Sequence, residues 1–333
     1  MEKPKNSNLH AAKSAKNDEF YTQYNDIAEE LKHYKEHFKG KVVYCNCDDP
    51  EWSNFWKYFH NNFRSLGLKK LISTHYAPGF EVSYAKIYEG GDDFNMEAGT
   101  TIDIYGNDDY APGDFRSDDS IQFLEECDIC CTNPPFSLFR SFISQLMAYE
   151  KKFIIIGNKN ALANKDIFPL VKNNKIWTGV RGFSGGMWFY AEYEGKTEKI
   201  VDGKKVINVP SIWFTNLDIT KRHDGLWHHN GEFDKTKAHT YYEGFEDFYP
   251  KYDNYDAINV DKTKDIPIDY EGVLGVPITF LDKYNPDEFE ILGCSAYSCP
   301  THFGCGALYV NGKKTYTRIL IRNKQPISKE DDI

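Results

Sequence analysis

Short apolar segments that alternate with amphipathic ones constrain the fold of this chain more than any other feature. The apolar segments are VVYC, KLIST, DICCT and KFIIIG, at residues 42–45, 70–74, 128–132 and 152–157. Segments with apolar residues at helical spacing lie before and between them, at 26–38, 53–63 and 137–148. Strands buried on both faces and joined by helices form parallel sheets. The pattern therefore predicts an α/β fold with a mainly parallel, doubly wound sheet.

Two further strands are expected in the same region. A hairpin-like insertion with the turn pair Gly90-Gly91 precedes TTIDIYG at 100–106, and VPSIWFTNL at 209–217 has the composition of a late strand of the same sheet. Beyond about residue 220 the sequence becomes polar, tyrosine-rich and aperiodic, although TYTRILIR at 315–322 indicates a strand. In a chain of 333 residues this change predicts a domain boundary, with domains at 1–220 and 221–333.

Charge is distributed unevenly along the chain. The net charge is −10, yet no Asp or Glu occurs between Ile291 and Lys329. Nucleic-acid phosphates are bound by local Lys and Arg, so this basic run is a candidate DNA contact. Its proposed contact residues are Lys313, Lys314, Arg318, Arg322 and Lys324. The alternative is an ordinary solvated surface.

Signals for export or for a membrane are missing from the sequence. No window approaches 18 uncharged apolar residues, and the first residues have no apolar core, so we expect a cytoplasmic protein without a membrane partner. The eight cysteines are scattered, which favours reduced thiols. Cys294, Cys299, His302 and Cys305 are a possible zinc cluster, but they lack the paired spacing of structural sites, so we expect no metal.

The segment CCTNPPFSLFR at 130–140 lies where a predicted strand ends and a helix begins, the usual place for sites in open parallel sheets. Pro134 and Pro135 fix φ and remove two N–H donors, which leaves the Asn133 side-chain oxygen and the Pro134 carbonyl as stiff acceptors. Such a pair suits an aromatic amine whose lone pair must face an electrophile, with Phe136 stacked on the ring. The alternative is a turn in which Asn133 caps the helix.

The tetrapeptide Asn133 to Phe136 resembles the catalytic motif of amino-directed DNA methyltransferases. Three longer blocks resemble the EcoRI-type adenine-specific enzymes: DEFYTQYNDIAEELKHYKEHFKGKVVYCNCDDPEWSNF, GDFRSD and PITFLDKYNPDEFEILG. The resemblance covers most of the chain. It implies a Rossmann-like methyltransferase fold, S-adenosylmethionine as cofactor, a gamma-like motif order and target recognition by residues 221–333.

The resemblance also assigns residues to the cofactor. They are Tyr21 and Thr22 in the motif that starts at Asp18, Asn46, Asp48 and Asp49 after the first strand, Asp114 and Phe115 in GDF, and Asn133. The segment Cys45 to Pro50 departs from the glycine-rich turn of most methyltransferases. Asp48 and Asp49 are candidates for holding the cofactor ammonium, and capping of the helix at 53–63 is their alternative role. GDF is either the reader of the cofactor adenine or a surface turn. No acid for the ribose is evident.

The segment GFSGGMWFY at 182–190 lies where the resemblance places a second base-stacking aromatic. Phe183 and Trp188 are the candidates, although each residue type is more often found in a core. Its glycines lack the spacing of a phosphate-binding loop.

Together these features predict a methyltransferase for the exocyclic N6 amine of a flipped-out adenine in duplex DNA. The family suggests GAATTC as the site, a cognate restriction endonuclease as a possible companion, and a monomer. Methylation of RNA or of a protein amide, and a non-catalytic DNA-binding or anti-restriction protein on the same scaffold, are the alternatives. The sequence does not identify the recognised bases.

Overall fold

The chain forms two compact units in the computed structural model. The first comprises residues 1–159 and 179–217, and the second comprises 160–178 and 218–333. The structure describes residues 21–93, 95–183, 185–190, 199–201, 203–229, 232–234, 239–241, 248–296 and 306–327. Residues 160–178 therefore group with the C-terminal part of the chain rather than with the segments that flank them.

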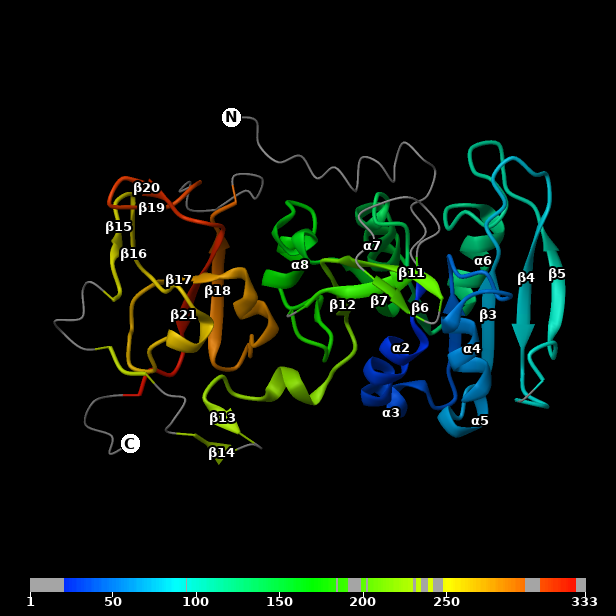
Figure 1. Cartoon of the computed structure of the whole chain (residues 1–333), viewed down its shortest axis with the longest axis horizontal. Helices are drawn as coiled ribbons and strands as arrows, with labels where there is room; N and C mark the ends of the chain where they lie inside the picture. Colours follow the sequence, from blue (N-terminus) through cyan, green and yellow to red (C-terminus); the bar gives the residue numbers. More distant parts are fainter. Residues whose placement is uncertain are drawn as a thin grey trace. The chain divides into compact units, whose positions relative to one another are not determined.

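The first unit is built on a mixed sheet with the strand order β5-β4-β3-β2-β6-β7-β12 (Figure 1). The strands are β2 (Val42–Cys45), β3 (Lys70–Thr74), β4 (Ser83–Tyr88), β5 (Thr100–Ile104), β6 (Ile129–Thr132), β7 (Lys152–Asn158) and β12 (Ser211–Thr215). All the strands expected in this region are confirmed. Every residue of β2, β6 and β12 is buried, which explains why these segments have so little polar alternation.

Parallel pairing is confined to the centre of this sheet. β2 pairs parallel with β3 and β6, and β6 pairs parallel with β7. β4, β5 and β12 are antiparallel to their neighbours, with β4 and β5 forming one edge (Figure 1). The expectation of a mainly parallel sheet therefore holds only for the four central strands. β4 and β5 pair as an antiparallel hairpin, and Gly90, Gly91 and Gly99 between them take positive φ.

The three segments with predicted helical spacing form helices in the first unit, and α6 (Asp118–Glu126) is a further helix that the sequence analysis did not predict. The other helices are α2 (Tyr24–Leu31), η1 (Lys32–Tyr34), α3 (Lys35–Phe38), α4 (Asn54–Asn61), α5 (Phe63–Leu66) and α7 (Phe139–Ala148). The segment 26–38 is interrupted by the 3-10 turn η1, yet its apolar positions Ile27, Leu31, Tyr34 and Phe38 are all fully buried. Ser53 caps α4, because its hydroxyl accepts the Phe55 N–H at 3.0 Å.

A second, smaller sheet in the same unit brings distant segments together. It has the order β1-β9-β11-β10, with β1 (Tyr21–Thr22), β9 (Met187–Tyr190), β10 (Lys199–Val201) and β11 (Lys204–Val209). Thr22 is paired with Phe189, and Tyr21 with Tyr190. Side chains alternate along β9, so Met187 and Phe189 are buried. The expected cofactor motif thus lies beside the aromatic segment at 182–190.

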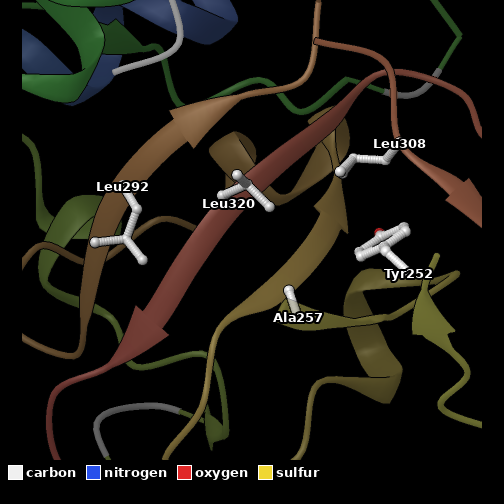
Figure 2. Close-up of a cluster of buried hydrophobic side chains, with 5 residues drawn as sticks. All are labelled: Tyr252, Ala257, Leu292, Leu308 and Leu320. Carbon is white, nitrogen blue, oxygen red and sulfur yellow. The ribbon is translucent and has the colours of Figure 1, made fainter. Parts of the chain in front are cut away.

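The second unit contains a five-stranded sheet with the order β15-β16-β17-β21-β18. The strands are β15 (Lys251–Tyr252), β16 (Tyr255–Asn259), β17 (Leu274–Pro277), β18 (Phe289–Cys294) and β21 (Arg318–Asn323). The strand expected within 315–322 is confirmed by β21. The core of the second unit includes a cluster of buried side chains shown in Figure 2: Tyr252, Ala257, Leu292, Leu308 and Leu320.

Shorter elements complete the second unit. They are α8 (Phe168–Lys172), β8 (Trp177–Thr178), η3 (Thr220–His223), η5 (Thr263–Asp265), η6 (Ile278–Asp282), and the two-stranded pairs β13 (His228–His229) with β14 (Glu232–Phe233) and β19 (Tyr309–Val310) with β20 (Lys313–Lys314). The 3-10 helix η2 (Lys159–Ala163) begins at the end of the first unit.

Across the described residues, no helix has both the length and the apolar character needed to cross a bilayer.

Candidate active site

A pocket of about 500 Å³ opens in the first unit where β2, β3 and β6 end. Eight residues predicted from the sequence line it: Tyr21, Thr22, Asp48, Asp49, Asp114, Phe115, Asn133 and Pro135. They come from separate stretches of the chain, and the carboxyl ends of parallel strands bring several of them to one edge of the sheet. Asn46, Pro134, Phe136, Phe183 and Trp188 were also predicted, but they do not line this pocket. Asp18 lies outside the described residues.

The turn after β2 has an unusual backbone. Cys47 has a φ of 95°, in the region that glycine adopts readily and other residues avoid. A cysteine therefore adopts, in this turn, the backbone conformation that a glycine would supply in a glycine-rich turn. Two hydroxyls fix the turn: Ser73 donates to the Asp48 carbonyl, and the Thr132 hydroxyl lies 2.8 Å from the Asn46 carbonyl oxygen.

Asp48 connects the turn to the Asn-Pro-Pro-Phe segment. Its buried carboxylate accepts hydrogen bonds from the Thr132 hydroxyl, from the Ser53 hydroxyl at 2.7 Å and from the Asn133 N–H at 3.3 Å. Burial raises the pKa of Asp48 to about 6, although these three hydrogen bonds partly oppose the shift. The alternative role in helix capping is thus partly realised, since Asp48 supports Ser53, which is the N-cap of α4.

Asn133 itself follows β6 and does not cap the next helix. Helix α7 begins at Phe139, and its N-cap residue is Leu138, five residues beyond Asn133. The Pro135 carbonyl accepts the Leu138 N–H at 3.0 Å, so the proline segment leads into the helix by a backbone turn. The capping alternative for Asn133 is therefore excluded by the position of the helix.

Asp49 belongs to a second cluster with residues that the sequence analysis did not identify. His75 Nδ1 lies 2.7 Å from its Oδ2, and Tyr84 donates to its Oδ1 at 3.0 Å. The His75 and Tyr84 rings are stacked at 5.1 Å. Burial works against ionisation of Asp49, but the hydrogen bonds from His75 and from the Glu51 N–H outweigh it and lower the pKa. His75 directly follows β3, so its place at the end of a predicted strand was the available signal.

The GDF segment supplies another side of the pocket. Arg116 donates to both Asp114 carboxylate oxygens, from Nε at 2.8 Å and from Nη2 at 2.7 Å. Phe115 is buried, meets Phe142 edge to face at 5.0 Å, and its carbonyl accepts from Gln145 at 2.9 Å. The Arg116 N–H also donates to Asp114 Oδ1, at 2.9 Å, so the remaining acceptor capacity of the carboxylate lies on Oδ2.

Aromatic residues lie both around the pocket and behind it. Trp52 and Tyr76 line the pocket with 66% and 41% of their surface exposed, and neither was predicted. Phe136 is buried and meets Phe189 edge to face at 6.2 Å. Phe183 is also buried, whereas Lys199 Nζ lies 4.0 Å from the Trp188 ring centroid. The aromatic residues predicted to stack on the base are thus packed against other side chains of the protein.

The basic residues of the second unit differ in their surroundings. Lys313 and Lys314 are exposed on β20, and Arg322 is half exposed, 3.8 Å from Glu290. Lys324 donates to the Pro286 carbonyl at 2.7 Å. Their positive charges all lie on exposed or partly exposed side chains.

Arg318 does not fit its predicted role in DNA binding. Only 7% of it is exposed, and its guanidinium donates to Asn259 and Asp261, each at 2.9 Å. The sequence shows the charge of a residue but not which side of a strand it faces, and β21 turns this one inward.

Most of the residues considered as zinc ligands lie outside the described part of the chain. Cys294 is a buried cysteine, while Cys299, His302 and Cys305 lie outside the described residues. Within the part of the chain that the structure describes, His, Cys, Asp and Glu side chains form no group of three or more suited to a metal ion.

The fold and the pocket define a class: an α/β protein with a ligand site at the carboxyl ends of central parallel strands, next to an Asn-Pro-Pro-Phe segment. A profile of the family "Adenine-specific methyltransferase EcoRI" matches residues 8–324. The chain therefore belongs to the EcoRI family of adenine-specific methyltransferases.

Individual relatives span nearly the whole chain. It is 48% identical to the Type II methyltransferase M.EcoRI of Escherichia coli, over 96% of this chain and 97% of that protein. It is 38% identical to the Type II methyltransferase M.MpnI of Mycoplasma pneumoniae, over 95% of this chain and 98% of the relative. No solved structure matched the chain.

Proposed function

We propose that this enzyme transfers a methyl group from S-adenosylmethionine to the N6 amine of an adenine flipped out of duplex DNA. The observation that carries the proposal is the convergence of Asp48, Asp114 and Asn133 on a single pocket, although they are far apart in the sequence. The volume of about 500 Å³ is in the range of cofactor sites. Membership of an adenine-specific family supports the choice of adenine.

The pocket suits a cationic nucleoside. Three carboxylates line it, those of Asp48, Asp49 and Asp114, and Phe115 supplies an apolar wall. The Thr22 hydroxyl is buried at the same site and, among the described residues, has no hydrogen-bond partner. Such a donor needs an acceptor, and the ligand would provide it. When bound, S-adenosylmethionine supplies the electrophilic methyl group.

The residues of the catalytic segment would hold the substrate amine. The Asn133 side-chain oxygen and the Pro134 carbonyl would accept its two hydrogens, which turns the nitrogen lone pair toward the methyl group. Phe136, with Phe183 or Trp188 opposite, would stack on the extruded base and offset the cost of unpairing, a few kcal/mol. Because Phe136 and Phe183 are buried as placed, this stacking requires side-chain rearrangement on DNA binding.

The two parts of the chain would divide the work. In our proposal residues 1–220 form a Rossmann-like catalytic domain, supported by its four central parallel strands, and residues 221–333 recognise the target. The exposed Lys313, Lys314 and Lys324 are the proposed phosphate contacts. GAATTC is the proposed site, and a monomer is the proposed active form.

Transfer of tritium from labelled S-adenosylmethionine tests the proposal. Purified enzyme is offered duplex DNA containing GAATTC, an RNA of the same sequence and a mixed protein substrate, and the product nucleosides are separated. We expect label in N6-methyladenine from DNA alone. Label in RNA or protein would establish the other enzymatic function, and cofactor binding without any transfer would indicate a DNA-binding protein on this scaffold. Methylation-sensitive long-read sequencing of DNA from cells expressing the protein then identifies the site.

A further inference from the structure

Among the described residues, the carboxylates that line the pocket differ in their partners. Asp49 lies beside His75, and Asp114 is paired with Arg116. The hydrogen bonds to Asp48, in contrast, all come from neutral groups, namely two hydroxyls and the Asn133 N–H. A buried carboxylate is costly to ionise without a countercharge. Asp48 is therefore the pocket acid whose countercharge is best supplied by a ligand.

We propose that the Asp48 carboxylate distinguishes the cationic cofactor from its neutral demethylated product by charge. This inference rests on the proposed function. The methyl group must reach an amine held by Asn133, so the sulfonium that carries it must come close to Asn133. The Asn133 N–H donates to Asp48 at 3.3 Å, which places the carboxylate next to the same position.

Among the described residues, no positively charged group is packed against Asp48. Cys45 on β2 and Cys131 on β6 are buried thiols, and burial raises the pKa of both well above the usual value for cysteine, so they remain neutral. Helix α4 contributes the Ser53 hydroxyl, and Asp49 of the same turn is negative and raises the pKa of Asp48 further. With a pKa of about 6, the carboxyl is partly protonated in the free enzyme at that pH.

Ligand binding and the protonation of Asp48 are then linked. A sulfonium favours the ionised acid, so the cofactor should bind more tightly as the pH rises through about 6 and should release protons on binding at that pH. In the proposed reaction the methyl–sulfur bond would break with its electron pair left on sulfur, a methyl–nitrogen bond would form, and the amine would lose one proton to solvent. The resulting thioether has no positive charge, and Asp48 again lacks a countercharge, which favours product release.

Calorimetric titration with S-adenosylmethionine and with S-adenosylhomocysteine, from pH 5 to pH 7.5, tests this inference. The two ligands share the amino acid and the nucleoside, so the ratio of their affinities isolates the sulfonium charge. We expect the preference for the cationic ligand to rise about fivefold to tenfold across this range, because the ionised fraction of a group with a pKa of about 6 rises from about a tenth to nearly one. A ratio independent of pH would overturn the inference.

Two variants assign the effect to one residue. Asp48→Asn should abolish the pH dependence of the ratio. Asp49→Asn should weaken both ligands but keep that dependence, since the pKa of Asp49 is lowered and it is already ionised. A ratio in Asp48→Asn that still follows pH would reject the role of Asp48.

Proton release in the wild-type enzyme provides a test that needs no variant. Titrations at pH 6 in two buffers with different ionisation heats should show that S-adenosylmethionine releases up to about half a proton more than S-adenosylhomocysteine. Equal release by both ligands would refute the inference even if Asp48→Asn fails to fold. Failure of both ligands to bind would instead refute the proposed cofactor.

Discussion

The Arg116 guanidinium donates two parallel hydrogen bonds, of 2.8 and 2.7 Å, to the carboxylate of Asp114, two residues earlier in the chain. The guanidinium fixes the carboxylate plane at the pocket wall. Because the Arg116 backbone N–H also donates to Oδ1, at 2.9 Å, the lone pair left for a ligand amine lies on Oδ2. Arg116 also lies 4.3 Å from the Tyr110 ring centroid, which restricts the arginine in turn. The acid is thus held in place before any ligand arrives.

We expect Asp114→Ala to weaken S-adenosylmethionine binding by about 1.5–3 kcal/mol, because it removes an acceptor and leaves Arg116 without its countercharge. Calorimetry measures the change directly. Asp109→Ala is the matched control, since Asp109 is an exposed acid of the same segment that does not line the pocket, and its affinity should remain that of the wild type. Wild-type affinity in Asp114→Ala would reject the proposed role of Asp114 in binding the adenine of the cofactor.

The backbone of Cys47 leads to a prediction about stability. At a φ of 95° a glycine is unstrained, whereas a side chain costs about 1 kcal/mol or more. Cys47→Gly should therefore leave the free energy of unfolding unchanged or slightly raised, and Cys47→Val should lower it by about 1–2 kcal/mol. Urea denaturation measures both. Cys130→Gly, in the buried strand β6, serves as the contrast and should be clearly destabilising.

Glu30 has a positioning role that the sequence did not indicate. Its buried carboxylate, on α2, accepts the N–H groups of Val180 and Arg181 at 2.7 and 2.8 Å and the Tyr34 hydroxyl at 2.8 Å. The segment that it holds leads directly to Phe183.

Glu30→Ala should lower the free energy of unfolding by about 3 kcal/mol or more, because two backbone donors lose their acceptor. Chemical denaturation tests this, and Glu29→Ala is the control. Glu29 is 73% exposed and pairs with nearby Lys32, so its removal should have little effect on the free energy of unfolding. Equal effects of the two substitutions would contradict the role of Glu30.

Local features of this chain were predictable where a single segment determines them. β2, β6 and β7 are recognisable because burial on both faces removes polar residues, and the cap at Ser53 is recognisable because it depends on adjacent residues. The direction of the edge strands was predicted less well. Apolar composition is the same for a parallel and an antiparallel strand, so β12 could be assigned to the sheet but not oriented.

Partners across long sequence separations could not be predicted. The pairing of Thr22 with Phe189 and the contact of Glu30 with Val180 depend on how the whole unit closes. Burial of Arg318 depends on the register of β21 against its neighbours. His75 is different, because it follows a predicted strand directly and could have been nominated on that basis.

We expect the basic residues of the second unit to fall into two groups, one that binds DNA and one that stabilises the fold. Lys313→Ala with Lys314→Ala should reduce the slope of log affinity for DNA against log salt by about 0.9 for each phosphate that the variant no longer neutralises, with little change in stability. Arg318→Ala should instead lower the free energy of unfolding, since Asn259 and Asp261 lose their donor. Filter binding at several salt concentrations, with thermal melting in parallel, distinguishes them. An unchanged slope in the lysine double variant would exclude β20 from the DNA interface.

The last prediction concerns Asn133, which the position of α7 frees from any capping role. If its side-chain oxygen holds the adenine amine, Asn133→Ala should abolish turnover while cofactor and DNA affinities stay within about threefold of the wild type. Asn133→Asp keeps an acceptor and should retain measurable transfer.

Phe136→Ala tests base stacking at the same site without removing the acceptor. A 2-aminopurine at the target adenine reports unstacking by its fluorescence, and the rise on enzyme binding should be altered in Phe136→Ala because the extruded base loses a stacking surface worth about 1–3 kcal/mol. In Asn133→Ala the fluorescence change should persist, since extrusion and transfer are separate steps. Near wild-type transfer by Asn133→Ala would show that the amine is held by other groups, and an unchanged signal in Phe136→Ala would remove Phe136 from the stack.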